Sequence, residues 1–278
     1  MKTPIWKVAT GQATRILRYS EVLEILRNLE LEPSGAWRRK RTASKGTVQI
    51  WLQALLFTGM RFSELHILHS YPELLQDDGT LLLEKNKFYD VGKKRQTNQE
   101  RVVYLSDMGL PIVQRFFEVP LLNSNPGEAF RYLDGVLSAT GKKLGYPERT
   151  MTFKENRTIG IHEVEQDGER WMEKQTAPVE RTIVTNGLSV RAFRKTWNSW
   201  LTNYFNDNVN SQVIVEMSMG HTDQIALKHY LSFQFDEEDS RDIAKAVKGF
   251  GIHTGWKDKL KSQDQNTSDQ NVTEEVKE

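Results

Sequence analysis

The stretch Val48-Gln-Ile-Trp-Leu-Gln-Ala-Leu-Leu-Phe-Thr-Gly-Met-Arg61 belongs to a chain of 278 residues. It predicts a helix and marks the residue at which that helix ends. The glycine at position 59 suits a left-handed cap. Arg61 then lies just past the helix end, at the start of a next helix at Ser63–Leu68, where a side chain can point into a cleft. The helix itself is indicated by apolar residues at helical spacing, namely Val48, Trp51, Leu52, Leu55 and Leu56.

Similar patterns predict the other elements of a mostly helical α+β domain with a small antiparallel sheet. Helices are expected at Ser20–Leu26 with Ser20 as N-cap, at 128–145, and from Ser189, where Arg191 and Arg194 are neighbours beside an apolar face. That face comprises Val190, Phe193, Trp197, Trp200, Leu201 and Tyr204. Strands are expected at 81–84 and 101–105, around a lysine-rich hairpin, and at 158–161 and 182–184 as an extra hairpin.

Charge is unevenly distributed along the chain, although the formal net charge is only +1. Acidic residues concentrate late, at 236–239 and 274–275, so one face of the front half can still bind phosphate. For the run Arg38–Arg41 a solvated loop is an equal alternative. The basic residues that we expect to contact DNA are Arg38, Arg39, Lys40, Arg41, Lys45, Arg95 and Lys195.

Composition excludes several classes of protein. The chain has no cysteine, which removes disulfides and thiolate metal sites. It has no apolar run of transmembrane length, and its N-terminus lacks the apolar stretch of a signal peptide. We therefore expect a cytoplasmic protein, associated with the nucleoid or encoded by a virus or plasmid, with no membrane partner.

Five residues in a fixed order suggest metal-free phosphodiester chemistry. Arg61 and Arg194 can neutralise the two nonbridging oxygens of a phosphate through planar, permanently charged groups. A lysine in the hairpin between them can protonate a leaving oxygen. Tyr230 can be the nucleophile, and His221 can take or stabilise its proton. Singly, each residue is better explained as a surface residue, a cap or a core tyrosine; the ordered set favours a site.

Three segments resemble the conserved boxes of the tyrosine recombinases, the phage integrase and Xer-type family. They are Thr58-Gly-Met-Arg-Phe-Ser-Glu-Leu65, Arg191-Ala-Phe-Arg-Lys-Thr196, and Met219-Gly-His221 followed by Tyr230. The resemblance covers residues 20–235. The chain is also similar to archaeal-type integrases. It implies Arg61 and Arg194 as catalytic arginines, Glu64 as a supporting acid and Tyr230 as the nucleophile.

The chain departs from the family pattern in several places. Arg191 and Lys195 stand where histidines are usual, which leaves His221 as the acid-base residue; Arg191 can still hold the phosphate. The hairpin start Gly92-Lys93-Lys94-Arg95 implies Lys93 as the general acid, with Lys94 in support. The N-terminal clamp domain of the family is expected to be missing or reduced to a stub.

The resemblance implies a DNA strand-cutting and strand-joining enzyme that needs no cofactor and no metal. Its partners would be double-stranded DNA and three further copies in a tetramer on DNA, with a monomer as an option without DNA. The stretch 243–250 would dock on the neighbouring copy. Alternatives are a type IB topoisomerase-like relaxing enzyme and a sequence-specific DNA-binding protein without turnover. We expect a stub at 1–18, a catalytic domain at 19–256 with an insertion at 147–187, and a disordered tail at 257–278.

Overall fold

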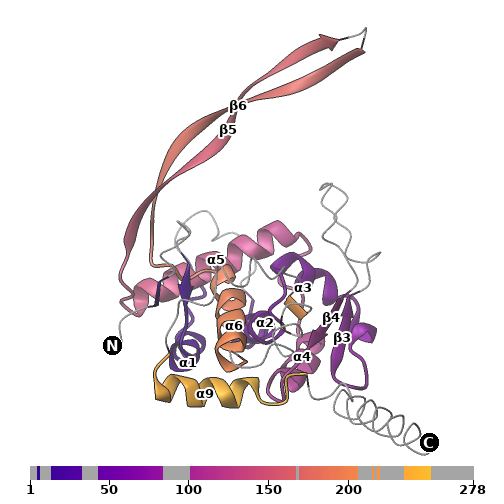
Figure 1. Cartoon of the computed structure of the whole chain (residues 1–278), viewed down its shortest axis with the longest axis vertical. Helices are drawn as coiled ribbons and strands as arrows, with labels where there is room; N and C mark the ends of the chain where they lie inside the picture. The colour runs from indigo at the N-terminus through magenta and orange to yellow at the C-terminus, as the bar shows by residue number, and fades with distance from the viewer. Residues whose placement is uncertain are drawn as a thin grey trace, which may run out of the picture.

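A computed structural model describes residues 5–6, 14–32, 43–83, 101–166, 169–205, 215, 218–219 and 235–251. Helices and three two-stranded antiparallel sheets make up this part of the chain, as expected for an α+β protein. The helices form one body, and a long hairpin rises from it (Figure 1). No described helix is long and apolar enough to cross a membrane.

Helix α2, Lys45–Thr58, is the centre of the body. Ten of its fourteen residues are buried, as expected for a helix that is apolar on all sides. It packs against α3 (Phe62–Leu68), α4 (Gly109–Glu118) and α6 (Val190–Tyr204). The Ser44 hydroxyl caps its start by accepting from the Thr47 N–H at 3.1 Å. The helix predicted from the spacing of its apolar residues is therefore confirmed.

Gly59 ends α2 in the left-handed conformation, with φ of 58°. Its N–H donates to the Leu56 carbonyl at 3.1 Å. A Cβ at this position would overlap the Met219 sulfur and lie 2.8 Å from Trp197 Cδ1. Both the backbone conformation and the close approach of α6 therefore require glycine here.

The sheet of β3 (Thr80–Leu83) and β4 (Arg101–Tyr104) and helix α5 (Pro126–Lys143) follow the sequence patterns. The two strands pair antiparallel, as predicted. Helix α5 starts two residues before the predicted range, because Asn125 caps it and proline suits its first position. Helix α4, strands β1 (Ile5–Trp6) and β2 (Arg15–Ile16) and the 3-10 helix η2 (Pro72–Leu74) were not predicted from the sequence.

Two predictions about helix ends and faces were wrong. Helix α1 spans Tyr19–Arg27, so Ser20 lies inside it; the N-cap is Arg18, whose N–H donates to Glu21 Oε2 at 2.9 Å. The Glu21 carboxylate, in the first turn, thereby accepts from the backbone N–H of the residue that precedes the helix. Tyr204 does not belong to the buried face of α6, because it lies in the last turn and is 45% exposed.

The residues before α1 belong to the same core as the helices. Leu17 is fully buried, its N–H donates to Thr196 Oγ1 at 2.9 Å, and its carbonyl accepts from Trp200 Nε1 at 3.0 Å. The packed body therefore begins before residue 19.

Helix α9, Glu237–Val247, covers α6 within the same chain. Its predicted amphipathic character is confirmed: Ile243, Ala246, Val247 and Phe250 are all buried. Arg18 also holds this helix, with Nε 3.0 Å from Asp239 Oδ2. The chain buries this apolar face internally; its docking on a neighbouring copy stays a prediction.

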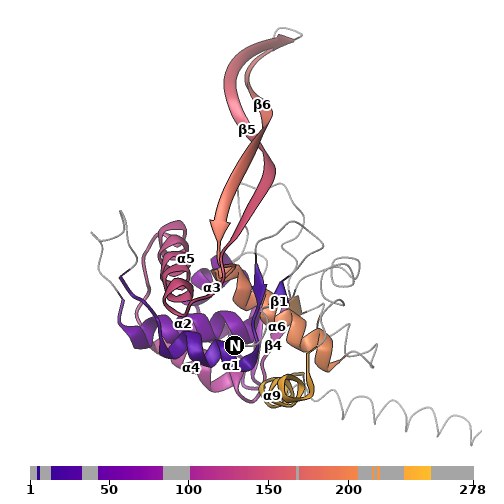
Figure 2. The same ribbon diagram turned by 90° about the vertical axis from the view of Figure 1, so that its left-hand side faces the viewer.

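The region predicted as an insertion forms one hairpin, which we call the arm. Strands β5 (Arg149–Gln166) and β6 (Glu169–Thr185) pair antiparallel along their length, with a bulge between Thr158 and Gly160. The predicted strands at 158–161 and 182–184 are confirmed as parts of the arm. The observed strands are far longer than the predicted ones. Figures 1 and 2 show it leading away from the body in both views.

We expect Gly59→Ala to lower the free energy of unfolding more than Gly145→Ala does. Both glycines have positive φ, but nothing lies within 4 Å of a Cβ at Gly145. The backbone cost alone is about 1 kcal/mol, and the collision with Met219 and Trp197 adds about 1–3 kcal/mol. Urea unfolding of both variants measures the difference; equal losses would show that α6 does not approach Gly59 closely.

Candidate active site

Arg194 connects the three segments singled out in the sequence. It lies on α6, and its guanidinium donates from Nη1 to the Gly59 carbonyl and from Nη2 to the Met219 carbonyl at 2.7 Å. Gly59 precedes Arg61 by two residues, and Met219 precedes His221 by two. One side chain therefore ties the end of α2 to the segment that leads toward His221.

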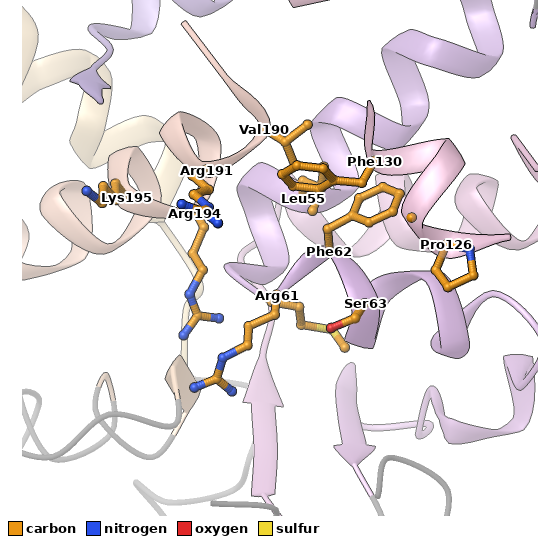
Figure 3. A pocket seen from close by; sticks show the side chains of 12 residues that line it. Leu55, Arg61, Phe62, Ser63, Pro126, Phe130, Val190, Arg191, Arg194 and Lys195 are labelled. Atoms are coloured by element: carbon orange, nitrogen blue, oxygen red, sulfur yellow. The ribbon is translucent and has the colours of Figure 1, made fainter. Parts of the chain in front are cut away.

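Arg61 lies at the N-cap of α3, as predicted from the helix-ending glycine. Its N–H donates to Glu64 Oε2 and its Nη1 to Glu64 Oε1, both at 2.8 Å. The side chain is 43% exposed, so solvent or a ligand can reach it. Figure 3 shows the guanidinium groups of Arg61 and Arg194 close together at the same end of the pocket.

Glu64 joins a third arginine to this pair. Its Oε2 also accepts from Arg101 Nη2 at 2.6 Å, and the Arg101 side chain is only 10% exposed. Burial opposes ionisation of Glu64, but the positive charges of Arg101, Arg194 and Arg61 outweigh it and lower the pKa to about 2. Near neutral pH, Glu64 is therefore a carboxylate that binds two arginines, Arg61 and Arg101.

Arg101 was not predicted as a site residue. It opens β4, which pairs with β3 beside α3, and only this pairing brings it to Glu64. Its sequence signal was its place at the end of the lysine-rich hairpin, which marked it as basic but gave it no partner.

A cavity of about 550 Å³ lies next to these arginines. Its walls are mainly apolar, and four cationic side chains lie along it (Figure 3). Burial, reinforced by the positive charge of Arg191, lowers the pKa of Lys195 to about 8. The lining residues are Leu55, Met60, Arg61, Phe62, Ser63, Pro126, Gly127, Phe130, Val190, Arg191, Arg194 and Lys195.

The arrangement suits an anion with several oxygens. Guanidinium groups bond paired oxygens, and a partly enclosed site strengthens their attraction for negative charge. Within the described ranges, no group of three or more His, Cys, Asp or Glu side chains could hold a metal ion. Arg61, Arg191, Arg194 and Lys195 supply positive charge along the described lining of the cavity.

The described residues include only part of the predicted site. Arg61, Glu64, Arg191, Arg194 and Lys195 come together around the cavity or its mouth. Lys45 lies apart from them, at the start of α2, where its Nζ donates to the Arg27 carbonyl. The other predicted residues lie outside the described part of the chain: Arg38, Arg39, Lys40, Arg41, Lys93, Lys94, Arg95, His221 and Tyr230.

We expect the ionised Glu64 to make the folded protein sensitive to acid. Its pKa of about 2 lies below the ordinary value of 4.5, so its contribution is full above pH 4.5 and is lost as pH falls toward 2. Between pH 5 and pH 2, wild type should lose about 3 kcal/mol more than Glu64→Gln. Urea unfolding at several pH values measures this, with exposed Glu118→Gln as the control that keeps the wild-type slope.

Arg191→Gln should raise the pKa of Lys195 from about 8 toward 10.5, because it removes the neighbouring positive charge. The folded chain loses this proton before the unfolded chain does, so Lys195 makes stability rise between pH 8 and 10.5. NMR titration of the lysine side chains measures the pKa, with Arg115→Gln on the exposed side of α4 as control. An unchanged Lys195 pKa in Arg191→Gln would show that burial alone sets it.

Comparison of the chain with protein-family models, with curated proteins and with solved structures gives no match.

Proposed function

We propose that the chain is a site-specific DNA recombinase or integrase, a tyrosine-recombinase catalytic domain that cuts and rejoins DNA through a 3′-phosphotyrosine. One observation carries the proposal: Arg194 donates to the carbonyls of Gly59 and Met219. Segments separated by about 135 and 25 residues thereby meet at one guanidinium. Chance matches to three boxes have no reason to converge on one point in space.

The electrostatics of the site also support phosphate as the ligand. Arg61 and Arg194 lie at one end of the cavity (Figure 3), and Glu64 is held by Arg61 and Arg101. Because Glu64 carries one negative charge among three arginines, the cluster keeps an excess of positive charge. That excess can bind a phosphate diester and stabilise the additional charge on its oxygens during attack.

In the proposed reaction, the Tyr230 oxygen attacks the phosphorus and forms a phosphotyrosine, and the bond to the 5′ oxygen breaks. The phosphate is held by Arg61, Arg191 and Arg194. His221 takes or stabilises the tyrosine proton, and Lys93 gives a proton to the 5′ oxygen. A 5′ hydroxyl of the partner duplex then attacks the phosphotyrosine and releases Tyr230. Bond energy is kept in the intermediate, so no cofactor is required.

The proposal includes double-stranded DNA as the partner and four copies on two duplexes. It also includes a cytoplasmic location, with the protein associated with the nucleoid or encoded by a virus or plasmid. Two related activities use the same chemistry or the same binding surface. A type IB topoisomerase would rejoin the original strand, and a DNA-binding protein without turnover would form no adduct. The cleavage experiment separates the binding protein from a recombinase, and relaxation of plasmid DNA separates the topoisomerase.

We expect a covalent protein–DNA adduct in wild type and none in Tyr230→Phe, on duplexes that carry sulfur at the bridging 5′ position. A randomised duplex pool serves as substrate because the site is not specified. Arg61→Ala and Arg194→Ala should lower the rate of adduct formation about 10²–10³-fold, as each removes a charge from the phosphate. The adduct is scored on denaturing gels.

Lys93→Ala is the matched control for proton donation. A thiolate leaves without a proton, so this variant should react at nearly the wild-type rate on the sulfur substrate and slowly on ordinary DNA. Relaxation of any plasmid by wild type would indicate the topoisomerase. Binding of DNA with no adduct from either substrate would contradict the proposal and favour a DNA-binding protein without turnover.

A further inference from the structure

The cavity beside the arginines has an apolar part that the proposed phosphate contacts do not use. Four helices supply its apolar side chains: Leu55 comes from α2, Phe62 from α3, Phe130 from α5 and Val190 from α6. At about 550 Å³ the cavity has the size of a small-molecule site, and a phosphate group alone would fill only a small part of it. The ligand that fits is therefore a phosphate joined to an apolar body.

Two phenylalanines give the apolar part a surface against which a flat ring can pack. The rings of Phe62 and Phe130 lie edge to face, with centroids 5.6 Å apart and an interplanar angle of 70°. Phe62 is buried, and the ring of Trp51 lies 5.9 Å from its ring. Phe130 is partly buried and lines the cavity (Figure 3). Proteins bind unpaired bases on aromatic side chains of this kind, because every base has a flat π-face.

The charges indicate which end of the cavity holds the phosphate. The guanidinium groups of Arg61 and Arg194 lie together at one end, and the two phenyl rings lie away from them (Figure 3). Arg191 and Lys195 add positive charge along the lining, and none of the twelve described residues that line the cavity is acidic. A ligand with an anionic end and a flat, apolar end matches this arrangement, and a nucleotide has both.

The proposed strand exchange produces such a ligand next to the phosphate. A 5′ end that leaves its own duplex and reaches the partner duplex must first give up its base pairs beside the cut. The bases released there lose their stacking and expose their faces to water. An apolar pocket that stacks on one of them offsets part of that loss.

We propose that the cavity is a nucleotide pocket, in which the base next to the cleaved phosphate leaves its pairing partner and packs against Phe62 and Phe130. The phosphate itself stays with the arginines. The inference rests on the proposed function for the identity of the strand. No amide or carboxylate side chain that could read adenine or cytosine is among the described residues of the lining, so stacking rather than hydrogen bonding holds the base.

The first test uses free ligands and requires no knowledge of the DNA site. Deoxyadenosine 5′-monophosphate, inorganic phosphate and deoxyadenosine are titrated into the full chain by isothermal titration calorimetry. The nucleotide should bind about tenfold or more tighter than inorganic phosphate, because their charges are similar and only the nucleotide carries a base. Deoxyadenosine should bind more weakly than the nucleotide, because it lacks the phosphate. A nucleotide that binds no tighter than inorganic phosphate would overturn the proposal.

Phe130→Ala should weaken nucleotide binding about fivefold or more and change phosphate binding by less than about twofold. Phe117→Ala is the matched control, because Phe117 is also a partly buried phenylalanine on a helix but does not line the cavity. Ser63→Trp gives the same test without removing a packed side chain: Ser63 is exposed and lines the cavity, so an indole there occupies the space of the base. Equal weakening of nucleotide and phosphate in both Phe130→Ala and Ser63→Trp would contradict a base pocket.

The second test asks whether the base belongs to the cleaved strand. The cut is mapped from wild-type adducts on the randomised pool, and an abasic nucleotide is then placed on either side of it. Phe130→Ala should slow adduct formation about fivefold or more on the intact sulfur duplex. On one of the two abasic duplexes the slowing should be less than about twofold, because the contact between the base and Phe130 is already absent. Equal slowing on the intact and both abasic duplexes would overturn the assignment to the cleaved strand.

The two tests separate a failure of the pocket from a failure of the proposed function. Adducts at Tyr230 without base-dependent binding would reject the pocket and leave the function intact. Base-dependent nucleotide binding by a chain that forms no adduct would reject the function, and with it the cleaved strand as the source of the nucleotide.

Discussion

The contact of Arg194 with the end of α2 is the constraint on which the site depends. Its guanidinium binds the carbonyls of Gly59 and Met219, and Trp197, one turn further along α6, fills the space beside Gly59. A helix can approach another this closely only where a side chain is absent, so the glycine serves both the turn and the packing. If α6 moved away, Arg194 would lose its two partners and its place beside Arg61.

A second constraint is electrostatic. Arginines brought together repel one another, and Glu64 is the carboxylate that reduces this cost by binding Arg61 and Arg101. The low pKa of Glu64 shows that the attraction exceeds the penalty of burial. Arg61 is the most exposed member of the group, so it keeps its position without losing access to a ligand.

The arm and the site are connected by the short segment between the end of β6 and the start of α6. Asn186 and Asp134 fix the chain between the end of β6 and the start of α6 by hydrogen bonds to and from the backbone. Few residues therefore separate the arm from the helix that carries three of the four cationic side chains along the cavity.

Most of the described helices and the cationic side chains around the cavity were predicted from the sequence, because apolar spacing and a helix-ending glycine are local signals; α4 was missed. The spacing of Val48 to Leu56 predicted α2, and Gly59 predicted the position of Arg61. Arg101 was missed because its role depends on the pairing of β4 with β3, a contact between residues far apart in the chain.

The amphipathic pattern of Ile243 to Phe250 predicted a helix but not its partner, since an apolar face packs equally well on its own chain or on another. The sequence by itself therefore determined most of the helical segments and which residues carry charge. Only the tertiary structure decided that α9 covers α6 and that Glu64 joins Arg61 to Arg101, because burial and ion pairing depend on distances that local patterns do not contain.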